Sequence, residues 1–305
     1  MKKYSLLFLL IPIVFAILMC NRKDNTEEET ILKGTASILV DETLTPIIED
    51  QVAVFESEYD AKITLLPRSE AEAIQALLKD TAQIIILPRK LTEQENRIFA
   101  NRKIIPKVTI FGTDAIALIS NKAVNDSLIA LQDILNFMNG KSTGNIQGLV
   151  FDDPNSSTLR QLTDLAEVGQ APEKGIFSFK TNEEVIKFVS ENRGMIGVVG
   201  LNWLAQPTAG IQDVSEKVQI LKVRGLTDNQ YYFPSQNNLA EGKYPLARDL
   251  YIVSAQGFSG LGVGFSSFIA GERGQRIILK SGLLPVRIPG RKVLIRNQIQ
   301  SKNTN

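Results

Sequence analysis

The feature that most constrains the fold is a regular alternation of short aliphatic runs with segments of helical periodicity. Runs suited to strands lie at 37–40, 62–66 and 83–87, and apolar residues recur at helical spacing over 44–59 and 70–78. The 83–87 run is nearly continuously aliphatic, which is typical of a parallel strand covered on both faces. This βαβα order predicts an α/β fold with right-handed crossovers.

The same alternation continues through the rest of the chain. Further strands are expected at 108–120, 149–151, 195–199, 218–223, 248–254 and 284–288. Thr92 is a suitable N-cap for a helix at 91–101. Further helices are expected at 127–138, 156–168, 182–192 and 262–281. A chain of 305 residues is long enough for about two domains of ordinary size.

The first twenty residues carry the pattern of a secretory signal. Lys2 and Lys3 precede an apolar stretch over 4–19, which is shorter than most membrane spans. The single cysteine, Cys20, follows at once, at the position where bacterial lipoproteins are cut and acylated. We expect lipidation at Cys20, with an uncleaved N-terminal anchor as the alternative. Both place the remainder in the periplasm or cell envelope.

Two polar segments lie at the ends of the remaining chain. Residues 21–33 are expected to be a flexible tether, because the stretch is mostly polar and contains three consecutive glutamates. Residues 296–305 are polar and are expected to be a disordered tail. The folded part should therefore lie between them.

Two absences in the composition narrow the function. The sequence has no histidine and only one cysteine, so Ser-His-Asp and Cys-His catalysis, an intrachain disulfide and a cysteine-based zinc site are excluded. The net charge of +1 does not point to nucleic acid. We expect no enzyme, no cofactor and no metal. A paired-carboxylate site at Asp152 and Asp153 is the enzymatic alternative.

Several segments occur in an informative order. Val40-Asp-Glu-Thr-Leu-Thr-Pro46 opens the first expected helix, Asp153-Pro-Asn-Ser-Ser-Thr158 opens a later one, and Gly194-Met-Ile-Gly-Val-Val-Gly200 covers a strand. Tyr244-Pro-Leu-Ala-Arg248 leads into another strand, and 274–285 ends the last helix. In this order the segments resemble the phosphate-binding periplasmic proteins that serve ABC importers, across about residues 34–290.

The resemblance implies an α/β, two-lobed periplasmic-binding-protein-like (type II) fold with two crossover strands and ligand in the cleft. The crossings would lie near 113–118 and 246–251. The first lobe would then hold 34–115 and 247–295, and the second 116–246. A monomer is expected for this architecture.

Helix starts supply the candidate ligand site. An oxyanion needs converging hydrogen-bond donors, and the first N–H groups of a helix lack internal partners and carry partial positive charge. Thr43, Ser69 and Ser156 begin three expected helices at carboxyl ends of strands, although each could be a simple N-cap. The expected ligand-binding residues at these starts are Thr43, Leu44, Ser69, Ser156, Ser157 and Thr158.

Charged residues beside these helix starts complete the candidate site. A guanidinium fork fits an oxyanion bidentately. Arg89 is the preferred candidate, because it ends a buried aliphatic strand and, by the resemblance, lies in the family's ligand-contacting loop. Arg68 and Arg160 are further candidates, and Asp41 could accept a proton from the ligand. The alternatives for the arginines are a solvated surface position or a pair with a nearby acid.

Three positions depart from the family pattern. Ser157 stands where the family has a glycine, Asp152 where it has an arginine, and Pro88 where it has a ligand-accepting aspartate. Two functions therefore stay open. One is capture of phosphate or a similar small oxyanion for an ABC permease. The other is a ligand-free sensory or interaction protein on the same fold.

Overall fold

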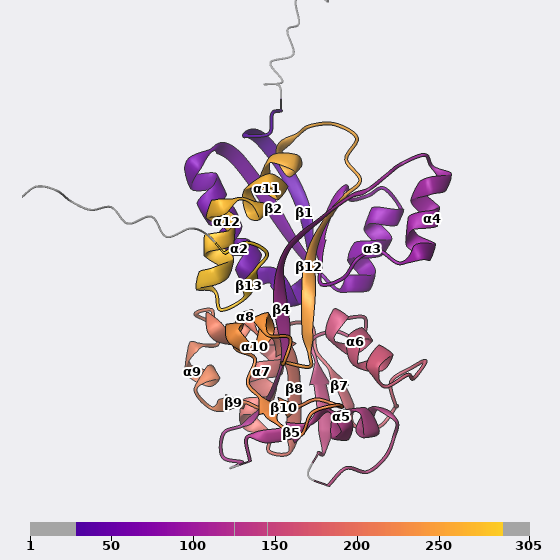
Figure 1. The fold of residues 1–305 in the computed structure, drawn as a ribbon, viewed down its shortest axis with the longest axis vertical. Coiled ribbons are helices and arrows are strands. Elements are labelled where there is room, and N and C mark those ends of the chain that lie inside the picture. The colour runs from indigo at the N-terminus through magenta and orange to yellow at the C-terminus, as the bar shows by residue number, and fades with distance from the viewer. Residues whose placement is uncertain (1–28, 125, 145, 289–305) are drawn as a thin grey trace, which may run out of the picture.

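Two long strands connect the two halves of the molecule. The structure, a computed structural model, describes residues 29–124, 126–144 and 146–288. Within these ranges the chain forms two α/β lobes, and β4 (Lys107–Asn121) and β12 (Ala247–Ser254) run from one into the other (Figure 1). Cys20, residues 21–28 of the expected tether and the tail at 296–305 lie outside the described residues.

The first lobe contains both ends of the described chain. In chain order its elements are β1 (Lys33–Asp41), the 3-10 helix η1 (Glu42–Leu44), α2 (Thr45–Glu58), β2 (Asp60–Arg68), α3 (Glu70–Leu78), β3 (Ile84–Leu87), α4 (Glu93–Asn101), α11 (Leu261–Ala270), α12 (Glu272–Lys280) and β13 (Leu284–Pro285). Strand β1 runs parallel to β2 and β3, and β12 runs antiparallel to β3 and β4. Helices α2, α11 and α12 lie on one side of the sheet, with α3 and α4 on the other (Figure 1).

The second lobe is inserted between the two crossings. Its elements are β5 (Leu128–Ala130), α5 (Leu131–Met138), β6 (Gly148–Phe151), α6 (Ser157–Leu165), β7 (Ile176–Ser178), α7 (Asn182–Glu191), β8 (Met195–Gly200), α8 (Asn202–Ala205), α9 (Gln212–Ser215), β9 (Val218–Ile220), β10 (Lys222–Arg224), β11 (Tyr231–Tyr232) and α10 (Gln236–Ala240). Strands β6, β7 and β8 are parallel, and β4 lies antiparallel to β8 and β9. A small separate sheet has the order β11-β10-β5.

Strand β4 changes partners where it passes between the lobes. Its first part, 107–115, pairs with β12, and Ile116–Ile119 pairs with β8. Residues 115–119 are completely buried, which explains why this stretch is uninterruptedly apolar. One hydrophobic cluster extends from Ile38 in the first lobe through Ile116 to Val198 in the second. The two lobes are therefore held in one continuous framework at the crossing.

Most expected elements are confirmed, and two helices differ from the prediction. Helix α3 spans the predicted residues, and the Thr92 hydroxyl caps α4 by accepting the N–H of Glu95 at 3.2 Å. The helix predicted at 127–138 is wrong in its first turn, because Leu128–Ala130 pair with β10. The expected helix at 262–281 is two helices, since extended Gly271 ends α11 and begins α12.

No helix within the described ranges is both long enough and apolar enough to cross a membrane.

Candidate functional site

The candidate site lies where the carboxyl ends of β1 and β6 face each other across the crossing strands. Asp41 ends β1 in the first lobe, and Asp152 directly follows β6 in the second. Asp114 on β4 and Arg248 on β12 lie between them. We call these four residues the crossing cluster. All four are buried, although charged side chains are almost never buried without partners.

Arg248 is the single cation of the crossing cluster. Its guanidinium donates to the hydroxyl of Ser157 at 2.9 Å, to the hydroxyl of Thr43 at 2.8 Å and to Oδ2 of Asp114 at 3.0 Å. The side chains of Arg248 and Asp114 are 3% and 0% exposed. Arg248 therefore ties both lobes to the crossing strands. Its Nε is buried without a partner.

Asp41 gathers donors from both lobes. Its Oδ1 accepts the backbone N–H of Thr43 at 3.0 Å, the Thr43 hydroxyl, and the hydroxyl of Ser157 at 3.2 Å. Its Oδ2 is buried with no partner. Burial raises the pKa of Asp41 to about 6, although the positive charge of Arg248 opposes the shift. The three donors that meet on Oδ1 would stabilise any negatively charged oxygen at that point.

The start of α6 supplies the hydroxyls of the second lobe. Ser156 is the N-cap and accepts the N–H of Leu159 at 3.3 Å. Its hydroxyl lies 3.0 Å from that of Thr158, which donates to Oδ1 of Asp152 at 2.9 Å. Burial and, to a smaller extent, the nearby carboxylate of Asp41 raise the pKa of Asp152 to about 7.

Glu42 forms a second contact between the lobes. Its two carboxylate oxygens accept the backbone N–H of Asn182 at 3.1 and 3.2 Å, and the Asn182 side-chain amide also donates to Glu42. Its backbone oxygen accepts the indole N–H of Trp203 at 3.4 Å. Burial raises the pKa of Glu42 to about 9, and Asp152 adds to the shift.

The three expected helix starts do approach one another. Thr43 and Ser157 both bind Arg248, and the buried Ser69 forms a capping box with Glu72 at the start of α3. The N–H of Ala71, in the first turn of α3, donates to the backbone oxygen of Asn155 in front of α6 at 3.4 Å. Leu44 is buried in the main hydrophobic cluster rather than in polar surroundings.

The arginines singled out in the sequence lie outside the crossing cluster. Glu70, at the start of α3, accepts Nε of Arg89 at 2.7 Å and Nε of Arg160 at 2.6 Å. The rest of the Arg89 fork binds Glu95, and Arg68 donates to the backbone oxygen of its neighbour Pro67. Arg89 and Arg160 line a groove of about 900 Å³ between α3 and α6, which reaches Ser156.

Sequence reasoning missed Arg248, although a signal was present. An arginine at the start of the aliphatic strand 248–254, inside an expected crossing, is unusual because a buried cation needs a partner. That signal did not identify Asp114 or Ser157, which lie 134 and 91 positions away.

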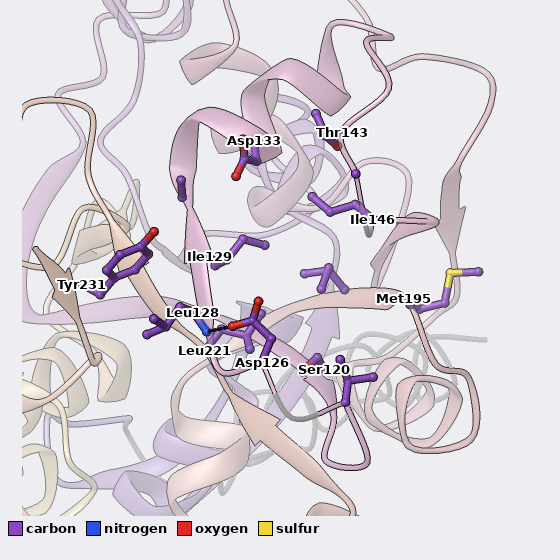
Figure 2. A pocket seen from close by; sticks show the side chains of 15 residues that line it. Ser120, Asp126, Leu128, Ile129, Asp133, Thr143, Ile146, Met195, Leu221 and Tyr231 are labelled. Atoms are coloured by element: carbon purple, nitrogen blue, oxygen red, sulfur yellow. Dashed lines mark hydrogen bonds between the residues drawn. The ribbon is translucent and has the colours of Figure 1, made fainter. Parts of the chain in front are cut away.

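A separate cavity of about 490 Å³ lies in the second lobe (Figure 2). Its lining includes Asp126, Asp133, Thr143, Met195 and Tyr231, and it shares no residue with the crossing cluster. Over the described ranges, no group of three or more acidic, histidine or cysteine side chains is arranged to hold a metal ion.

Two α/β lobes that meet over a buried polar cluster at two crossing strands define the class of two-lobed binding proteins. Comparison with family models agrees with this class: the PBP superfamily domain matches residues 25–273. The chain belongs to the PBP superfamily. A comparison with curated protein sequences found no match.

Solved structures with this fold include several related to phosphate. A candidate phosphate ABC transporter substrate-binding protein from Clostridium perfringens, with bound phosphate, is 19% identical, with a TM-score of 0.67 over 83% of this chain and 100% of that one. An ABC-type phosphate transport receptor from Vibrio cholerae is 16% identical, with a TM-score of 0.61 over 83% and 100%. A possible phosphate binding protein from Planctomyces limnophilus is 16% identical, with a TM-score of 0.56 over 84% and 94%. At these identities the likeness establishes the fold, and the predicted fold class is confirmed.

Proposed function

We propose that this protein is an extracytoplasmic solute-binding protein that captures a small oxyanion between its lobes and delivers it to an ABC-type permease. The observation that carries the proposal is the convergence of Thr43, Ser157 and Arg248 on one point at the crossing. These residues come from η1, α6 and β12, so the point has donors from both lobes only when the cleft is closed.

The geometry of Asp41 supports an anionic ligand. One oxygen of Asp41 already receives two hydroxyls and a backbone N–H. A ligand oxyanion can take over these donors if the lobes part and the Asp41 side chain turns away. The buried Nε of Arg248 offers one further unpaired donor. Small tetrahedral anions need such a donor set and little space.

The carboxylates favour a ligand that carries protons. Asp152 can accept a hydrogen bond from the proton of hydrogen phosphate, whereas fully deprotonated sulfate offers none and is repelled. Phosphate is therefore the first ligand to test, in keeping with the relatives of the same fold. Acylation at Cys20 would hold such a protein in the cell envelope near a permease.

Ligand-induced stabilisation of the full-length protein tests the proposal. A ligand at 100 times its dissociation constant adds about 2.7 kcal/mol to the free energy of unfolding. We expect millimolar phosphate to raise the melting temperature more than sulfate does. Ser157→Ala should weaken this response, because it removes a donor at the crossing. Thr163→Ala is the matched control, since its hydroxyl bonds only the backbone of its own helix at 2.7 Å.

Two results would overturn the proposal. One is the absence of any shift with phosphate, arsenate, sulfate and molybdate, which would favour the ligand-free alternative. The other is an equal response in Ser157→Ala and Thr163→Ala.

A further inference from the structure

Three buried carboxylates from opposite lobes share the closed cleft. Asp41 and Glu42 come from the first lobe and are 1% and 8% exposed. Asp152 comes from the second lobe and is 1% exposed. Each of the first two is bonded across the cleft, Asp41 to Ser157 and Glu42 to Asn182. Asp152 is bonded within its own lobe to Thr158 and interacts electrostatically with Asp41 across the cleft, so closing the lobes brings all three carboxylates together away from water.

We propose that closure of the two lobes takes up protons, so that the cleft closes more readily in acid than at neutral pH. The inference rests on the proposed function in one respect, namely that the lobes open and close to admit a ligand. Closure is a hinge movement of two rigid lobes about the crossing strands.

The physical cause is burial of like charges. In an open cleft the carboxyls are hydrated and titrate near their ordinary values of about 4. Closure removes water from the three carboxyls, and burial raises the pKa of Asp41 to about 6. Burial together with the charge of Asp41 raises the pKa of Asp152 to about 7, and burial together with the charge of Asp152 raises the pKa of Glu42 to about 9. Because the closed state binds protons more tightly, its advantage is greatest at low pH and declines as pH rises through these values.

The surrounding charges do not cancel this effect. Among the residues that the structure describes, Arg248 on β12 is the one buried cation, and Asp114 on β4 already pairs with it at 3.0 Å. Glu70 on α3 adds negative charge near Asp41. The arginine of α6, Arg160, is held by Glu70 itself and by Asp164.

The second-lobe helices nearest Glu42 add no positive charge at their starts. Helix α7 begins with Asn182, Glu183 and Glu184, and Glu184 accepts the backbone N–H of Lys180. Helix α8 offers Asn202 and Trp203, which are uncharged. The starts of these two helices therefore place no cation against Glu42.

The single tryptophan provides a native probe of closure. Trp203 lies on α8 of the second lobe, is buried, and donates to the backbone of Glu42 in the first lobe. Opening should expose its indole to the neutral quencher acrylamide. The measurement uses the full-length protein without ligand, from about pH 8 to about pH 5.

We expect quenching of Trp203 to fall as the pH falls. Each proton taken up changes the closing equilibrium about tenfold per pH unit between the open and closed pKa values. Asp152→Asn keeps an oxygen for the Thr158 hydroxyl but is uncharged at every pH, so the closed state no longer needs a proton at this position. The variant should therefore show less quenching than the native protein at about pH 8 and a weaker dependence of quenching on pH. Asp153→Asn is the control. The carboxylate of Asp153 is next to Asp152 in the sequence but accepts only the backbone N–H of Asn155, at 2.7 Å.

Quenching that is independent of pH in the native protein would overturn the inference. So would equal behaviour of Asp152→Asn and Asp153→Asn. If Asp152→Asn fails to fold by circular dichroism, Glu42→Gln takes its place with the same expectation. Because the assay contains no ligand, a failure of phosphate binding would overturn the proposed function and leave this result standing.

Discussion

Replacing Arg248 with Met tests whether one buried cation holds the crossing together. The substitution keeps an unbranched apolar side chain but removes the guanidinium from Ser157, Thr43 and Asp114. Asp114 is then left completely buried without its counter-charge. Removal of one partner from a buried ion pair costs about 3–5 kcal/mol of stability. For a protein of this size, that corresponds to a fall of about 6–20 °C in melting temperature.

The loss should depend on pH. Burial raises the pKa of Asp114 and the charge of Arg248 lowers it, so removing Arg248 raises that pKa further. At low pH the lone Asp114 takes up a proton and its penalty disappears, whereas at high pH the full penalty applies. We expect Arg248→Met to lose more stability at about pH 8 than at about pH 5.

Urea unfolding followed by Trp203 emission measures both the loss of stability in Arg248→Met and its dependence on pH. Arg248→Met combined with Asp114→Asn should recover part of the loss, because no unpaired buried charge remains. Arg97→Met is the control, since Arg97 is 76% exposed and pairs only with Glu93 on the same helix. A loss below about 1 kcal/mol, or a double variant no better than the single one, would refute the role given to Arg248.

Two further changes probe contacts between the lobes. Glu70 pairs with Arg89 and Arg160 in the network that joins α3 to α6, so Glu70→Gln should lower the free energy of unfolding by about 1.5–3 kcal/mol. The same substitution should increase acrylamide quenching of Trp203. Glu93→Gln on the exposed face of α4 is the control and should change neither quantity. Gly200→Ala should destabilise by about 1–3 kcal/mol in urea, because its Cβ would lie 2.5 Å from the backbone oxygen of Thr43. Gly169→Ala has open space and should be neutral; equal effects of the two substitutions would contradict the close approach of the lobes.

The elements of this fold were largely predictable because their causes are local. Hydrophobic spacing located α3, and the hydroxyls of Thr92 and Ser156 cap the helices that follow them. The resemblance to phosphate-binding periplasmic proteins placed a crossing within the long apolar strand β4. Where local causes compete, prediction failed: 128–130 has helical spacing, but its backbone pairs with β10, an element about ninety positions away in the chain.

The sequence by itself determined the α/β alternation, the crossing strands and the helix starts that face the cleft. Only the tertiary structure decided which charges meet there. Arg89 and Arg248 are equally cationic in the sequence, yet Arg89 is held by Glu70 and Glu95 at the rim while Arg248 enters the crossing cluster. The reason is that helix and strand formation depends on neighbours along the chain, whereas the pairing of a buried charge depends on side chains that sheet order brings together from distant positions.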